Sequence, residues 1–167
     1  DALAEVMAPT SCEPPIISGF DAWAGYLVLD AWVAGRDRHH ENWAVIDRSG
    51  ALRLAPSFDH GNALGFQESE QRVSALAADD VQLTRWSKRG TSFHFAGGPT
   101  LVDVAAAALR LAGSAVQDHW RSRLAETTAD DLIAIFDQIP DTLMSDHGRR
   151  FRVKLLNANK ERILDDR

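Results

Sequence analysis

The chain has 167 residues, the usual size of one domain, with 45% hydrophobic and 25% charged residues, as in ordinary soluble globular proteins. Its net charge of −6 provides no general attraction for nucleic acid, so we expect no direct nucleic-acid partner. The single cysteine, Cys12, excludes an internal disulfide, and no apolar run approaches the length of a membrane span. Because no signal peptide is visible either, the sequence predicts a cytoplasmic protein without a membrane partner.

The first predicted helix follows a short connecting segment. Prolines after Cys12 predict a linker over residues 1–17. Ser18 and Asp21 form an S-x-x-D capping signature, which opens a helix that Gly35 is expected to end. The apolar stripe of this helix comprises Phe20, Trp23, Leu27, Ala31 and Ala34. We expect the helix to be buried and to support the loop that follows it.

A β-hairpin is predicted next. Residues 43–46 form its first strand and residues 47–50 its turn, with Gly50 free to take positive φ. Residues 52–58 return as the second strand. Alternation would place Leu52, Leu54 and Pro56 on one face, and Arg53, Ala55 and Ser57 on the other.

Three polar residues flank this hairpin. Asp37 and Asn42 precede the first strand, and Asp59 follows the second. An antiparallel hairpin brings all three to one end. Phosphoryl transfer needs a carboxylate near the attacking hydroxyl and hard oxygen ligands for magnesium on the phosphates. The spacing D-x-x-x-x-N, from Asp37 to Asn42, is that of the catalytic Asp and the metal-binding Asn in a kinase catalytic loop.

The rest of the chain is predicted to be mainly helical. Residues 68–78 and 81–86 have helix-forming composition, and residues 87–99 form a loop. A modest basic patch in this region is interpreted as a solvated surface and consists of Arg85, Lys88, Arg89 and His94. The expected N-caps of the four helices after Pro99 are Thr100, Ser114, Thr128 and either Ser145 or Asp146. The apolar face of the last helix comprises Phe151, Leu155, Leu156 and Ile163.

The runs GRDRHHENWAVI and LAPSFDHGNALG together resemble the catalytic core of the HipA-like bacterial kinases. They are similar also to the type II phosphatidylinositol 4-kinases and the Fam-type secretory kinases, which share this atypical kinase fold. The resemblance implies a Mg²⁺- and ATP-dependent phosphotransferase, with Asp37 as catalytic carboxylate and Asn42 and Asp59 as magnesium ligands. The acceptor would be a protein Ser/Thr or another hydroxyl, and neither the motif nor residues 66–98 identify it.

Four further residues in these runs are expected to support the site. His39 matches a histidine of the HipA-type motif with a structural role. Arg38 and His40 match the D-R-H-H run of the Fam-type enzymes less closely. His60 is interpreted as a polar residue bonding the hairpin.

A kinase also needs a phosphate-covering loop and a strand lysine in an N-terminal lobe. The 167 residues contain no G-x-G-x-x-G and no V-A-I-K-like segment. The chain is therefore expected to be a single domain, residues 1–167, with the fold of a protein-kinase-like C-terminal lobe, mainly α with a small β-hairpin. In this interpretation residues 1–17 follow the hinge, residues 18–65 carry the supporting helix and catalytic hairpin, and residues 66–167 are helical. The missing N-terminal lobe of the same protein would be its partner, and the lobe alone would be inactive.

Two other functions remain open from the sequence. The first is a metal-dependent phosphohydrolase that uses His39, His40, Asp59 and His60. The second is a non-catalytic, kinase-like binding module. The intact Asp37, Asn42 and Asp59 count against the second.

Overall fold

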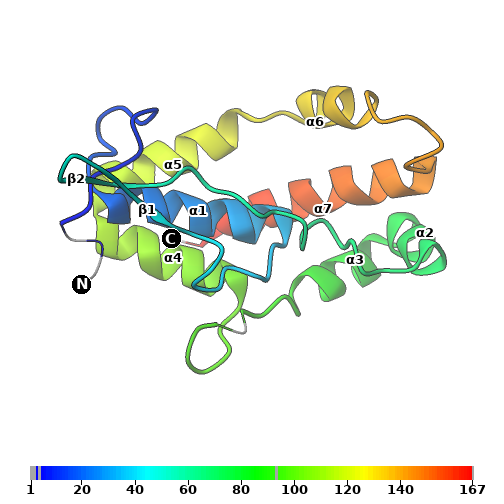
Figure 1. Cartoon of the computed structure of the whole chain (residues 1–167). Helices are drawn as coiled ribbons and strands as arrows, with labels where there is room; N and C mark the ends of the chain where they lie inside the picture. The colour runs from blue at the N-terminus through cyan, green and yellow to red at the C-terminus, as the bar shows by residue number, and fades with distance from the viewer. Residues whose placement is uncertain (1–2, 4, 93, 167) are drawn as a thin grey trace.

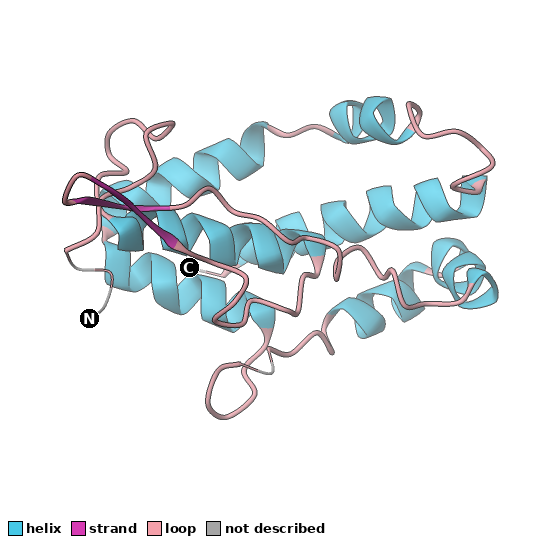
Figure 2. Ribbon diagram, viewed as in Figure 1, coloured by secondary structure: helices cyan, strands magenta, loops and turns pink. Residues whose placement is uncertain are grey.

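The computed structural model describes residue 3, residues 5–92 and residues 94–166, so residues 1, 2 and 4 of the predicted linker lie outside the described residues. Within this part of the chain, seven helices form most of the structure and one two-stranded antiparallel hairpin lies at one end of it (Figure 1), with irregular segments between many of the elements (Figure 2). The prediction of a mainly helical chain with a small hairpin is confirmed. No helix in the described residues is long and apolar enough to cross a membrane.

Helix α1, Gly19–Val33, begins as predicted. The Ser18 hydroxyl accepts a hydrogen bond from the Asp21 N–H, and the Asp21 carboxylate accepts one from the Ser18 N–H. The predicted stop at Gly35 is one residue late, because Ala34 takes the left-handed conformation, with φ of 55°. The N–H groups of Ala34 and Gly35 both donate to the Asp30 carbonyl, which offsets the cost of this conformation, about 1–2 kcal/mol.

The hairpin is shorter than predicted and shifted along the sequence. Strands β1, Val45–Arg48, and β2, Ala51–Leu54, pair in antiparallel register with Val45 opposite Leu54. Ser49 and Gly50, with φ of 56° and 84°, form a two-residue turn. Two left-handed residues match the twist of a hairpin, which lets β1 continue through residues predicted as turn. The positive φ predicted for Gly50 is confirmed.

Burial along the hairpin does not follow the predicted alternation. Leu54 is 1% exposed, whereas Leu52 on the same face is 38% exposed and Pro56 is exposed as well. Ala55, predicted for the opposite face, is buried. The reason is that only the base of the hairpin rests on the core, while its tip projects away from the helices (Figure 1).

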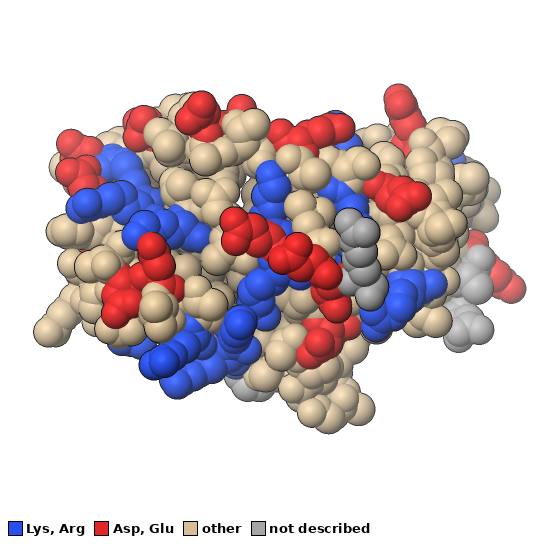
Figure 3. Space-filling model, turned by 180° about the vertical axis from the view of Figure 1, so that it is seen from behind, with Lys and Arg blue, Asp and Glu red and all other residues tan. Residues whose placement is uncertain are grey.

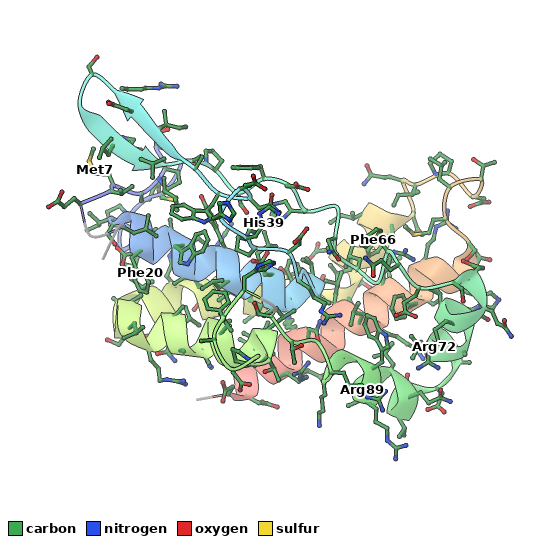
Figure 4. All side chains as sticks on the ribbon, turned by 60° about the horizontal axis from the view of Figure 1, so that its bottom comes forward. Met7, Phe20, His39, Phe66, Arg72 and Arg89 are labelled. Atoms are coloured by element: carbon green, nitrogen blue, oxygen red, sulfur yellow. The ribbon has the colours of Figure 1, made fainter. Side chains whose placement is uncertain are left out.

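Residues 5–18 pack beside this hairpin. The main-chain N–H of Met7 donates to the Leu52 carbonyl and the Leu54 N–H donates to the Met7 carbonyl, each at 2.9 Å. Figure 4 shows Met7 beside the hairpin. Its neighbours Val6 and Ala8 are buried. The segment expected to be a linker is therefore part of the packed structure.

Two short helices and a longer pair follow. Helix α2, Glu70–Ala78, is capped by Ser69, and α3, Asp80–Ser87, by Asp79. Helix α4, Leu101–Ala112, starts from the predicted cap. Helix α5, Ser114–Glu126, does not, because Gly113 alone separates it from α4 and already occupies the N-cap position. Ser114 is therefore the first helical residue, and the predicted capping box there is wrong.

The last two helices agree with prediction. Helix α6, Ala129–Phe136, has Thr128 as its N-cap. Helix α7, Asp146–Asp165, has Ser145 as its N-cap, the first of the two residues predicted for this position. Helix α7 contacts each of the other six helices of the described chain. Its predicted apolar face is buried at Phe151, Leu155, Leu156 and Ile163. With α1, which packs on α4, α5 and α7, it forms the base on which the hairpin and its loops lie.

Candidate functional site

Residues 35–44 form an irregular loop between α1 and β1, and internal hydrogen bonds fix its shape. The His39 N–H donates to the Asp37 carbonyl at 2.9 Å, and the Asn42 N–H donates to the His39 carbonyl at 3.0 Å. The side-chain Nδ2 of Asn42 donates to the same Asp37 carbonyl at 2.6 Å. The first and last residues of the D-x-x-x-x-N motif are therefore joined directly.

The Asn42 side chain is 3% exposed, and its orientation follows from this bond. Because its amide nitrogen is committed to the Asp37 carbonyl, Oδ1 is the atom through which Asn42 can act on a cation. A carboxamide oxygen is a hard ligand suited to magnesium. The contact thus fixes the orientation of the Asn42 amide.

The Asp37 carboxylate lies on the accessible side of the loop, with 42% of the side chain exposed. Its Oδ1 is 3.8 Å from His39 Nε2 and 3.5 Å from His94 Nε2. The His40 ring centroid is 5.9 Å from that of His39, which places His40 at the edge of this group. Figure 4 shows His39 on the loop that crosses α1.

His94 was not predicted as a site residue. The sequence predicts that it belongs to a basic surface patch, but in the structure His94 lies beside Asp37, with its ring centroid 5.6 Å from that of His39. The Arg36 Nε donates to the Thr91 carbonyl at 3.1 Å, which connects this loop to the loop of residues 35–44. No motif could have identified His94, because its position depends on packing between distant segments.

Arg38 points into the protein. Its guanidinium makes two hydrogen bonds with the Asp30 carboxylate, at 2.6 and 2.8 Å, and donates to the Asn42 carbonyl at 2.9 Å. Both side chains of the ion pair are almost fully buried, at 5% and 7% exposure. Arg38 is thus held by Asp30 of α1, a partner that was not predicted from the sequence.

Asp59 follows the second strand of the hairpin in the sequence. The Ala55 N–H donates to the Ala44 carbonyl, which extends the antiparallel pairing by one residue pair beyond the strands. Asp59 follows Ala55 by four residues, in a segment outside the strands. Asp59 is exposed and left-handed, with φ of 55°.

The structure does not assemble the residues of the alternative phosphohydrolase site. Asp59 and His60 are both exposed. Among the described residues, no three His, Cys, Asp or Glu side chains are arranged to hold a metal ion. A hydrolytic metal centre built from protein ligands needs such a cluster, whereas magnesium on ATP takes one or two protein ligands and the phosphates.

Tyr26 of α1 also faces the loop. Its hydroxyl donates to the Ala55 carbonyl at 2.8 Å, and its ring centroid is 5.9 Å from the Arg38 Cζ. Burial raises the pKa of Tyr26 to about 12, Cys12 adds to this, and the positive Arg38 opposes it. The hydroxyl is thus a neutral hydrogen-bond donor at physiological pH.

A small cleft of about 170 Å³ borders the loop through Arg36 and is lined also by Asn62, Phe66 and Trp86. A wider cleft of about 620 Å³ lies between α6 and α7, and none of its lining residues belongs to the loop of residues 35–44. On the face shown in Figure 3, acidic side chains interrupt the basic ones.

Comparisons of the chain with protein-family models, with curated proteins and with solved structures found no match.

Proposed function

We propose that this chain is the C-terminal lobe of a Mg²⁺- and ATP-dependent kinase of the HipA-like type. The hydrogen bond from Asn42 Nδ2 to the Asp37 carbonyl carries the proposal, because it joins the two motif residues and turns Asn42 Oδ1 into a potential metal ligand. The accessible Asp37 carboxylate suits a group that meets a substrate hydroxyl. The acceptor is a protein Ser/Thr or another alcohol.

Each residue has a defined task in this proposal. Asp37 accepts the proton of the attacking hydroxyl and orients it. Asn42 and Asp59 would hold magnesium through their side-chain oxygens. Bound Mg²⁺ and ATP supply the γ-phosphoryl group and neutralise its charge. Arg38 keeps the loop in place from beneath, while His39 and His94 line the approach to Asp37.

Manganese-induced line broadening in NMR spectra tests the metal assignment. Mn²⁺ with a non-hydrolysable ATP analogue is added to isotopically labelled protein. Broadening should centre on Asn42 and Asp59, and Asp59→Asn should weaken it. Asp47→Asn is the matched control, because Asp47 lies in β1 next to the hairpin turn and its side chain accepts a hydrogen bond from the Gly50 N–H.

Two results would contradict the proposal. One is the absence of broadening near Asn42 and Asp59 at millimolar Mn²⁺ and nucleotide. The other is broadening centred elsewhere, for example on the acidic residues Asp137 and Asp146 of the α6–α7 cleft. Either outcome would favour a binding module without catalytic metal. Residues 1–167 alone should transfer no phosphate from ATP to a protein acceptor, because they lack the nucleotide-covering segments that a kinase needs.

A further inference from the structure

Helix α1 uses two different faces. One face, which includes Leu27 and Ala31, packs into the core formed with α4. The other carries Trp23, Tyr26 and Asp30, spaced three and four residues apart and therefore aligned along the helix. Each of these three side chains contacts a different part of the catalytic hairpin and its loops.

Asp30 holds the catalytic loop. Its carboxylate binds the Arg38 guanidinium, which in turn donates to the Asn42 carbonyl. Arg38 follows Asp37 directly in the sequence. One buried side chain on α1 therefore fixes the loop near both ends of the Asp37–Asn42 motif.

Tyr26 holds the opposite segment. Its hydroxyl bonds the Ala55 carbonyl, four residues before Asp59. Tyr26 precedes Asp30 by four residues, so the two residues are about 6 Å apart along the helix axis. The Trp23 ring adds an edge-to-face contact with Trp43, at 5.2 Å between centroids, where the loop enters β1.

The Asp30–Arg38 pair is a poor candidate for a purely stabilising contact. Removing two charges from water costs several kcal/mol per ion, and replacing a buried pair with apolar residues of similar volume is often neutral or stabilising. What a bidentate pair adds is geometry, because the planar guanidinium fixes both distance and angle.

We propose that Asp30 and Tyr26 are positioning residues, which together set the separation between Asn42 and Asp59. Asp30 acts on Asn42 through Arg38, and Tyr26 acts on the segment leading to Asp59. The rigid helix between them keeps the two segments in register. The reason for holding these two residues apart rests on the proposed function. The effect of Asp30 and Tyr26 on the two segments can nevertheless be measured without catalysis.

The first experiment separates positioning from stability. The double variant Asp30→Leu with Arg38→Met replaces the ion pair with apolar side chains and should remain folded. Amide hydrogen exchange is then measured by NMR. Exchange at His39 and Asn42 should accelerate by about tenfold or more, because the loop loses its anchor, while Leu109 in the α4 core stays protected. Unchanged exchange at His39 and Asn42 in the folded variant would overturn the role of Asp30.

The second experiment uses a smaller change. Tyr26→Phe removes one hydroxyl and should accelerate exchange of the Ala55 N–H by about threefold to tenfold, the equivalent of one hydrogen bond. Asp131→Asn is the control, because it perturbs the exposed cap of α6 far along the sequence from the hairpin. A change at the Ala55 N–H no larger than in the control would overturn the role of Tyr26.

Manganese broadening links these variants to the site. In the wild-type protein, Mn²⁺ with the ATP analogue should broaden the NMR signals of Asn42 and Asp59 together. Each positioning variant should weaken this effect severalfold while the protein stays folded. Broadening that is absent in wild type refutes the proposed function, whereas broadening that persists unchanged in the variants refutes only the positioning role.

Discussion

His94 Nε2 lies 3.5 Å from Oδ1 of Asp37, although Asp37 lies in the loop after α1 and His94 lies in the loop before α4. Both side chains are partly exposed, at 34% and 42%. A partly exposed ion pair contributes about 0–1 kcal/mol to stability. Asp37 is therefore accessible without being a structural anchor, which is what a residue acting on a substrate requires.

Asp37→Asn should leave the free energy of unfolding within about 1 kcal/mol of wild type. In a form of the protein active in phosphoryl transfer, it should lower kcat by about 10²–10⁴, because a positioned general base contributes that much. Urea denaturation and ATP turnover measure the two effects. Glu41→Gln is the matched control, since Glu41 is a 75% exposed carboxylate on the same loop and should affect neither. Near-normal turnover by Asp37→Asn would refute the catalytic assignment.

The two proposed metal ligands should differ in their structural roles. Asn42→Asp places a carboxylate against the Asp37 carbonyl and removes a buried hydrogen bond, so it should cost about 1–3 kcal/mol of stability. Asp59→Asn should change stability by less than about 0.5 kcal/mol, because Asp59 is exposed and asparagine tolerates its left-handed φ. Urea denaturation of both variants checks the contrast. Equal losses would show that Asn42 is not held as described.

The sequence predicts the elements well because local signals determine them. Capping residues mark the starts of α1, α4, α6 and α7, and each side chain caps its helix. The prediction fails at Ser114, where the shortness of the connection rather than the residue type decides the cap. Local signals are also ambiguous in the hairpin turn, where two left-handed residues replace the predicted four-residue turn.

The site is predictable only in part, for a similar reason. Asp37 and Asn42 are linked through local sequence, and their spacing suffices to pair them. His94 and Asp30 contact the loop of residues 35–44 because α1, α4 and the loop after α3 pack together. The periodicity of the sequence does not predict such contacts. The predicted stripe on α1 was built from apolar residues alone, so it included Trp23 but could not detect Asp30, a buried charged residue on the same side of the helix.

Gly25→Ala tests how α1 is packed. A Cβ atom at Gly25 would overlap the Trp120 ring, whose Nε1 donates to the Asp21 carbonyl and is therefore held in place. Overpacking of this kind costs about 1–3 kcal/mol or more, so the thermal midpoint should fall by several degrees. Gly61→Ala is the control, since its nearest atom, Asp59 Oδ1, is 3.9 Å away. That variant should match or slightly exceed wild type. A stable Gly25→Ala protein would contradict the close α1–Trp120 contact.

The titration of Tyr26 directly probes the contact between the hairpin and α1. Tyr26 is the chain's one tyrosine, so the near-ultraviolet absorbance of tyrosinate reports on it alone. Burial raises its folded pKa to about 12, from 10.0 as the ordinary value. Because the folded pKa is the higher one, the protonated hydroxyl stabilises the fold fully below about pH 10, and this contribution is lost as pH rises through about 12. The native midpoint should therefore lie near 12, or ionisation should coincide with alkaline unfolding, whereas in denaturant the midpoint should fall to about 10. Tyr26→Phe should abolish the signal. A midpoint near 10 in protein that remains folded would mean that the Tyr26 hydroxyl is open to water and does not hold the segment leading to Asp59.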